Sequence, residues 1–259
     1  MKNGTIFTGA ATALITPLTA EGVDYEAYGK LIDWQIEEGI DALVIAGTTG
    51  EGSTLTYTEH QDAIRYAAER AAGRVPIIAG SGSNDTNRAI AESVDRPIIL
   101  YNVPSRTGVN IEPATYAALA EIPNIAAIKE ANGNISKIVE TRALVGDALD
   151  IYSGNDDQIV PILSMGGAGV ISVLSNVMPR QTSRLCKRFF EGDLAGSAKM
   201  QCELLPLIQG LFSEVNPIPV KAAMAAMGWC ENYVRLPLTP MEDAHWQALR
   251  AEMVRQGLL

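Results

Sequence analysis

The sequence is poor in the residues that build metal sites and disulfide frameworks. Its 259 residues include three cysteines and two histidines, His60 and His245. The cysteines, Cys186, Cys202 and Cys230, are odd in number, lie far apart and show no metal-ligand spacing. We therefore expect reduced thiols and neither a disulfide framework nor a Cys/His metal site.

Positive charge and long apolar runs are also scarce. The net charge is −10 and no Lys/Arg-rich run occurs, which argues against nucleic acid or an anionic membrane as partner because both require a positive surface. No run approaches the roughly 18 apolar residues of a membrane span. Met1–Phe7 contain one lysine and no long apolar core, so we expect no secretory signal and a cytoplasmic protein.

Hydrophobic residues make up 47% of the chain, enough for a large core. They gather in short runs rich in Val, Ile and Ala, and this continuous apolar character is typical of strands covered on both faces of a parallel sheet. Seven such runs are predicted as strands: Ala11–Pro17, Asp41–Gly47, Val75–Gly80, Pro97–Asn102, Ile125–Ala131, Leu149–Gly154 and Ala168–Val173.

Helical patterns lie between these runs. One begins at Asp24 and stops at Gly39, and another is predicted to open with a capping box from Thr58 to Gln61 and to end at Gly73. Strands that alternate with helices of this length indicate βαβ units. We expect a (β/α) barrel over residues 1–178 and a C-terminal helical region packed on it over residues 179–259.

Seven strands are one too few for a closed barrel of this type, which needs eight. Between Val75 and Pro97 only one short helical pattern is found, around Thr86–Val94. On this pattern alone, a seven-stranded or doubly wound sheet remains open.

Polar residues follow two of the predicted strands at their carboxyl ends, where such folds place active sites. Gly47–Glu51 (GTTGE) offers two hydroxyls and unencumbered N–H groups that suit a small carboxylate; the alternative is a plain strand-to-helix turn. Tyr101 is a candidate proton relay and Arg106 a candidate carboxylate ligand. The alternative for these two is core packing and a solvated loop charge.

Lys129 stands inside an otherwise apolar strand. Burial of its ammonium is costly and lowers the amine pKa, which makes a lysine nucleophilic towards a carbonyl. Glu130 must point to the opposite face of the sheet and is interpreted as structural. A lysine that extends from the strand end to water is the alternative, but Thr48, Tyr101 and Lys129 at the same end of three strands are more specific than any one of them.

These residues carry a family resemblance. The chain resembles the dihydrodipicolinate synthase family of pyruvate-dependent class I aldolases, which is related to N-acetylneuraminate lyase. The likeness runs through nearly the whole chain, in the segments TALITP, GTTGEGSTL, VPIIAGSGSN, PIILYNVPSRTG, AAIKEANGN, YSGNDD, GGAGVISV and NPIPVK.

The resemblance implies a fold, a reaction and a set of roles. It implies a (β/α)8 TIM barrel, usually in a homotetramer built as a dimer of dimers, and no metal or organic cofactor. Lys129 would form an imine with pyruvate, whose carboxylate would be held by Thr48 and Thr49. Tyr101 and Thr48 would relay protons while the enamine attacks L-aspartate 4-semialdehyde. The pocket residues implied for the two substrates are Arg106 for the aldehyde's carboxylate and Gly169 and Ile171 for pyruvate.

The chain departs from the family pattern near residues 90–95. There the family carries a fourth βα unit, with a Thr-Pro-Tyr-Tyr-Asn-like motif whose second tyrosine completes the proton relay across a dimer interface. No such motif occurs here. Either the protein carries a segment that this sequence omits, or the unit is truly deleted, which would leave an open barrel and an incomplete relay.

Three other functions compete with the synthase. A pyridoxal-phosphate enzyme would also use Lys129, but the acidic run Gly154–Asp157 would repel a phosphate. A related lyase or sugar-acid aldolase would keep Lys129 and Tyr101 and choose another aldehyde, against which Arg106 argues. An inactive homologue gains weight if the deletion is real.

Overall fold

Seven parallel strands form one curled sheet in a computed structural model, which describes residues 4–81 and 95–259. The order across the sheet is β5-β4-β1-β9-β8-β7-β6. The strands are β1 (Gly9–Ala13), β4 (Ala42–Ile45), β5 (Ile77–Ala79), β6 (Ile98–Asn102), β7 (Ile125–Glu130), β8 (Asp150–Ser153) and β9 (Gly169–Ser172). Each lies within or overlaps one of the seven predicted runs, so the predicted parallel architecture is confirmed.

The inner and outer faces of the sheet are filled differently. On the inner face, the small residues Ala11 and Ala127 cluster with Ile171 and with the stacked rings of Phe7 and Tyr152. The outer face packs against helices through larger aliphatic side chains. This division keeps the inside of the curl narrow and leaves its carboxyl end for polar side chains.

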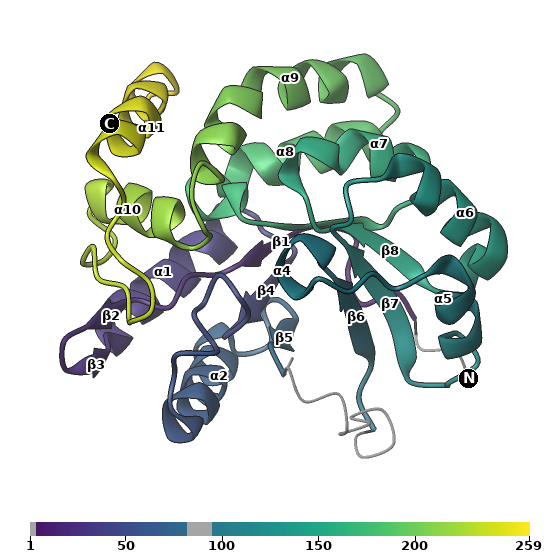
Figure 1. Ribbon diagram of the computed structural model, residues 1–259, viewed down its shortest axis with the longest axis horizontal. Helices are drawn as coiled ribbons and strands as arrows, with labels where there is room; N and C mark the ends of the chain where they lie inside the picture. The colour runs from purple at the N-terminus through teal and green to yellow at the C-terminus, as the bar shows by residue number, and fades with distance from the viewer. Residues whose placement is uncertain (1–3, 82–94) are drawn as a thin grey trace.

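Helices surround the outer face (Figure 1). They are α1 (Tyr25–Glu37), α2 (Tyr57–Ala71), α4 (Pro104–Thr107), α5 (Pro113–Leu119), α6 (Ile135–Val145), α7 (Ile159–Ser164), α8 (Pro179–Phe190), α9 (Leu194–Leu211), α10 (Ile218–Ala226) and α11 (Asp243–Arg255). Short 3₁₀ turns follow α6, β8 and β9, at Gly146–Ala148, Asp156–Gln158 and Leu174–Asn176.

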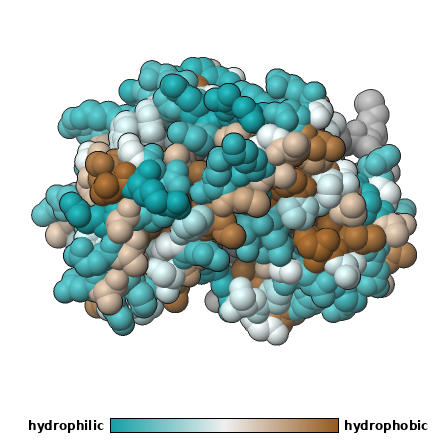
Figure 2. Space-filling view, turned by 90° about the horizontal axis from the view of Figure 1, so that it is seen from above, coloured by the Kyte–Doolittle hydropathy of each residue, from teal (hydrophilic) through white to brown (hydrophobic). Residues whose placement is uncertain are grey.

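The C-terminal helices continue the outer layer. Helix α8 packs on β1 and β9, α9 packs on α8, and α11 packs on α9 and α10. Hydrophilic residues cover most of the face seen in Figure 2, with hydrophobic residues in small groups, as expected for helices whose apolar sides face inward. No helix in the described ranges combines the length and apolar character of a membrane span.

Two local details differ from the sequence prediction. The capping box of α2 runs from Thr56 to Glu59, not from Thr58 to Gln61: the Thr56 hydroxyl accepts from the Glu59 N–H and the Glu59 carboxylate accepts from the Thr56 N–H. The same spacing occurs two residues earlier, and there Glu59 gains Arg235 as a second partner. A small hairpin of β2 (Leu18–Thr19) and β3 (Gly22–Val23) was not predicted.

The two edges of the sheet are β5 and β6, consecutive in the described chain. Within the described residues β5 pairs only with β4, and β6 pairs only with β7. The sheet therefore curls as a barrel does, but the described strands do not close it. The helical pattern predicted at Thr86–Val94, and most of the predicted break near residues 90–95, lie outside the described residues.

Candidate active site

Lys129 and Tyr101 lie side by side at the carboxyl end of adjacent strands. The register of β6 and β7 pairs Tyr101 with Lys129, and the Lys129 Nζ lies 4.2 Å from the centre of the Tyr101 ring. Because side chains alternate along β7, Lys129 shares the inner face with Ala127. The predicted pairing of an amine with a tyrosine is therefore present in the geometry.

The surroundings of Lys129 raise the fraction of its amine that is neutral. Burial lowers the pKa of Lys129 from the ordinary 10.5 to about 8; the Asp156 carboxylate opposes this shift and the Arg106 guanidinium adds to it. An amine with a pKa near 8 supplies free nucleophile at neutral pH, as imine formation requires.

Tyr101 keeps its proton at neutral pH. Desolvation raises the pKa of its phenol, with Arg106 opposing the rise, although the residue is 38% exposed on the edge strand β6. A protonated phenol beside the amine can donate a proton to an oxygen held at Lys129 and recover one in a later step.

The turn after β4 presents hydroxyl and N–H groups. Thr48 is exposed and Thr49 is buried. No described residue accepts a hydrogen bond from the N–H of Thr48 or Thr49. Ala46 and Glu51 bracket the turn in left-handed conformations, with φ of 53° and 54°. Neighbouring N–H groups in such a turn form a concave site for an anion.

Arg106 approaches this turn through Asn216, a residue that sequence reasoning missed. The Arg106 side chain donates to the Asn216 carbonyl at 3.4 Å, and the Asn216 side chain donates to the Thr49 hydroxyl at 2.9 Å. Asn216 is buried and lies 167 residues from Thr49. The only local signal for it is its place at the start of the Asn216–Val220 elbow.

Ile171 lies inside the curl with Ala127 and Tyr152, but Gly169 does not reach the same end. Gly169 is the first residue of β9, at the amino end of that strand, and a Cβ there would lie 1.9 Å from the Gly9 carbonyl oxygen. Its missing side chain is required by the β9–β1 pairing, so we correct the prediction and leave Gly169 out of the proposed site.

Gly154, rather than Gly169, lies at the carboxyl end of the strands, next to Lys129. It directly follows β8, its N–H donates to the Glu130 carbonyl at 2.7 Å, and a Cβ there would lie 2.8 Å from the Cβ of Ala131. The absence of a side chain lets the carboxyl ends of β7 and β8 approach closely beside Lys129.

Asp156 is a second missed residue. One carboxylate oxygen accepts from the N–H groups of Val173 and Leu174, both at 2.9 Å, which ties the loop after β8 to the end of β9. Burial raises the pKa of Asp156, while Ser172, these two N–H groups and Lys129 oppose the rise. The sequence had indicated only an acidic loop, not a carboxyl group whose charge acts on the amine.

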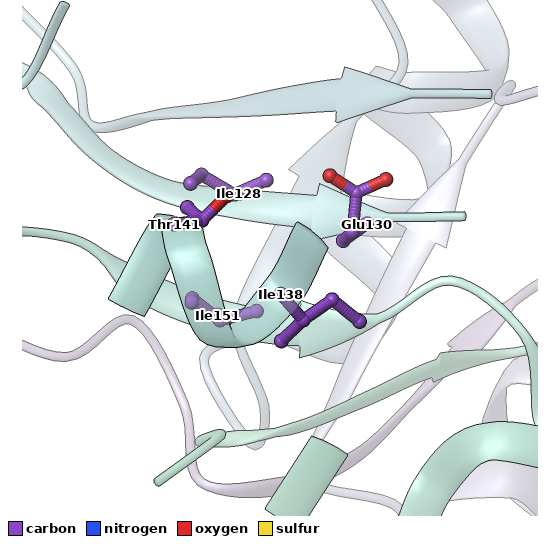
Figure 3. Close-up of a pocket in the computed structure, with 5 residues that line it drawn as sticks. All are labelled: Ile128, Glu130, Ile138, Thr141 and Ile151. Carbon is purple, nitrogen blue, oxygen red and sulfur yellow. The ribbon is translucent and has the colours of Figure 1, made fainter. Parts of the chain in front are cut away.

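Glu130 takes the structural role predicted for it. It points to the outer layer, where its carboxylate accepts from the Asn102 amide and the Tyr116 hydroxyl, both at 2.9 Å. The cavity drawn in Figure 3 lies on this side and is too tight to hold a water molecule; its lining residues are Ile128, Glu130, Ile138, Thr141 and Ile151. It is a packing void beneath α6, on the opposite face of β7 from Lys129.

Metal ligands do not gather at this end of the sheet. Across residues 4–81 and 95–259, no group of three or more His, Cys, Asp and Glu side chains is arranged to hold an ion. The amine of Lys129 lies beside the Tyr101 phenol, and the Asp156 carboxylate and Arg106 guanidinium act on it. The Thr49 hydroxyl is connected to Arg106 through Asn216.

Comparison with known proteins matches nearly the whole chain. A family model described as "Dihydrodipicolinate synthetase family" matches residues 6–93 and 85–256. The 4-hydroxy-tetrahydrodipicolinate synthase of Lachnoclostridium phytofermentans is 48% identical over 292 aligned positions, which cover 98% of this chain and 99% of that protein.

Solved structures agree with this match. Dihydrodipicolinate synthase from Thermotoga maritima superposes with a TM-score of 0.95 at 37% identity, covering 98% of this chain and all of that one. The chloride-inhibited dihydrodipicolinate synthase from Acinetobacter baumannii, solved as a complex with pyruvate, gives a TM-score of 0.95 at 35% identity, with 98% and 100% covered.

Proposed function

Because the chain belongs to the dihydrodipicolinate synthetase family, we propose that it condenses pyruvate with L-aspartate 4-semialdehyde to give 4-hydroxy-tetrahydrodipicolinate, the reaction named for its relatives. The observation that carries the proposal is the pairing of Lys129, whose amine has a pKa of about 8, with Tyr101 on the next strand. The reaction places the enzyme in the biosynthesis of lysine and diaminopimelate.

The proposed chemistry starts at the Lys129 amine. The neutral amine attacks the ketone of pyruvate, water leaves, and loss of a methyl proton from the imine gives an enamine. The N–H groups and hydroxyls of Thr48 and Thr49 hold the pyruvate carboxylate, and Ile171 borders the pocket. Tyr101 and Thr48 move the protons that these steps require.

The second substrate enters beside the enamine. Arg106 holds the carboxylate of the semialdehyde, since a guanidinium fork matches a carboxylate. The enamine carbon attacks the aldehyde, whose oxygen takes up a proton and becomes the hydroxyl. The amino group of the semialdehyde then attacks the imine carbon and closes the ring, and the Lys129 amine leaves. A related aldolase that accepts another aldehyde is the second candidate, and Arg106 is the residue that argues against it.

We further propose that the chain lacks the fourth βα unit of its family. The alignment with the L. phytofermentans enzyme spans 292 positions although this chain has 259 residues, so at least 33 aligned positions have no counterpart here. The two matched stretches of the family model meet and overlap at residues 85–93. In addition, within residues 4–81 and 95–259 the edge strands β5 and β6 each pair on one side only, and an eighth strand would pair on the other side.

The proposed assembly is a cytoplasmic homotetramer built as a dimer of dimers. The missing unit would contribute to the tight interface and to the proton relay, so its absence weakens association and catalysis together. Light scattering after gel filtration reports the mass of the particle directly.

The condensation assay tests the proposed function. Purified protein is given pyruvate and L-aspartate 4-semialdehyde, and the cyclic product is followed together with a Lys129→Ala variant. Product that depends on Lys129 supports the proposal. A protein that binds pyruvate yet forms no product with this aldehyde, but condenses another, is instead the related aldolase. A protein inert towards every aldehyde is the inactive homologue.

A further inference from the structure

Glu51 closes the turn that carries Thr48 and Thr49 in a conformation unusual for its residue type. Its φ is 54°, a region that residues with a side chain rarely adopt. Its N–H donates to the Thr48 carbonyl at 3.1 Å, and its own carbonyl accepts from the N–H groups of Thr54 and Leu55. Glycine would take this backbone conformation without strain, so the Glu51 side chain must supply something that glycine lacks.

The Glu51 side chain forms a fully buried ion pair. The Lys221 Nζ lies 2.7 Å from its carboxylate, and neither side chain has any exposed surface. Lys221 also donates to the Tyr233 carbonyl at 2.8 Å, while the Arg235 N–H donates to the other Glu51 oxygen at 3.1 Å. Desolvation of two charges offsets much of their attraction, so such a pair contributes more to geometry than to net stability.

Helix α10 and the residues just before it contact the turn at two points. Lys221 lies on the helix, and Asn216 lies just before it and donates to the Thr49 hydroxyl at 2.9 Å. Between the two contacts, Gly50 packs so closely that a Cβ would lie 3.0 Å from the Leu14 carbonyl oxygen. The turn is therefore held on both sides of Gly50, by Asn216 before α10 and by Lys221 on it.

We propose that Glu51 and Lys221 are positioning residues that orient the N–H groups of Thr48 and Thr49 for a substrate carboxylate. Neither residue touches the substrate. The inference rests on the proposed function, because it takes pyruvate as the ligand of this turn. It assigns to the ion pair a part in binding pyruvate, separate from the amine chemistry of Lys129.

The test measures how much pyruvate is needed to trap the Lys129 imine with borohydride in the full chain. In the variant Glu51→Gln/Lys221→Met the ion pair is removed and side-chain volumes are nearly kept. We expect half-saturation to rise at least about tenfold, with the same adduct yield at saturating pyruvate and the same pH midpoint. Leu207→Ala, a buried change in α9 at a side chain that makes no hydrogen bond or ion pair with the turn, is the control for lowered stability.

The inference is overturned if the double variant needs no more pyruvate for half-saturation than the unaltered protein. It is also overturned if Leu207→Ala, at a matched drop in melting temperature, raises the half-saturating pyruvate concentration equally. If the double variant does not fold, Glu51→Gln alone carries the same expectation and the same refutation. Failure of the unaltered protein to trap pyruvate is a different result, which removes the proposed function and the inference with it.

Discussion

The amine of Lys129 is the group on which the proposed chemistry depends, and its reactivity is set by its neighbours. Burial moves its pKa from 10.5 to about 8, the Asp156 carboxylate opposes the shift, and Arg106 adds to it. The sequence predicted the lysine and its tyrosine partner, because an amine in an apolar strand is visible locally; in the structure Lys129 is half-buried beside Tyr101. Asp156 and Asn216 were missed because their contacts join segments distant along the chain.

The rate of pyruvate trapping should rise with pH and level off above about 8, because only the neutral amine attacks. Asp156→Asn removes a negative charge and should move the midpoint to lower pH, whereas Arg106→Met removes a positive charge and should move it higher. The Arg106 shift should be the smaller of the two, since that side chain is exposed and its charge is screened. Rapid-quench trapping across pH 6–10 measures all three midpoints, and shifts of the opposite sign would contradict this account.

Secondary structure was predicted well where the pattern is local and poorly where one spacing fits two positions. All seven described strands of the curled sheet lie within or overlap predicted apolar runs, and Asp24 caps α1 as expected, accepting from the Ala27 N–H. The start of α2 was placed two residues late, because Thr58–Gln61 and Thr56–Glu59 have the same spacing. Only the tertiary contact of Glu59 with Arg235 distinguishes them.

The capping box of α2 gives a matched pair of variants. Thr56→Ala should lower the free energy of unfolding by about 1 kcal/mol, because the Glu59 N–H loses its acceptor. Thr58→Ala, on an exposed position of the first turn, should change it by less than about 0.5 kcal/mol. Urea unfolding of both variants decides between the two caps, and a larger loss in Thr58→Ala would contradict the assignment.

The whole molecule is a curled, barrel-like parallel sheet that the described strands do not close. Its seven parallel strands and superposition on full-length relatives fix the fold. Each of the seven predicted runs corresponds to a described strand of the curled sheet, yet the number of runs alone did not separate a barrel from a doubly wound sheet. The order β5-β4-β1-β9-β8-β7-β6, in which the first and last strands are successive described strands, separates them.

Restoring the proposed fourth unit should improve both stability and activity. The relevant variant carries the unmatched segment of the L. phytofermentans enzyme inserted near residues 90–95. A strand that pairs with both edges satisfies their backbone groups, and a completed relay should raise the condensation rate by about 10²-fold or more. The melting temperature and the condensation assay measure the two effects.

A Gly/Ser insertion of equal length at the same place is the control for chain length alone. We expect the inserted family segment to raise both the melting temperature and the condensation rate, and the Gly/Ser insertion to raise neither. Equal behaviour of the two insertions would mean that the chain already closes its barrel and needs no further unit.

The measurement that tests the central claim most directly is mass spectrometry of the protein after incubation with pyruvate and borohydride, followed by peptide mapping. We predict one reduced pyruvate adduct per chain, on the peptide that contains Lys129, and none in Lys129→Arg. An unmodified chain, or an adduct on another lysine, would contradict the assignment of Lys129 as the imine-forming residue.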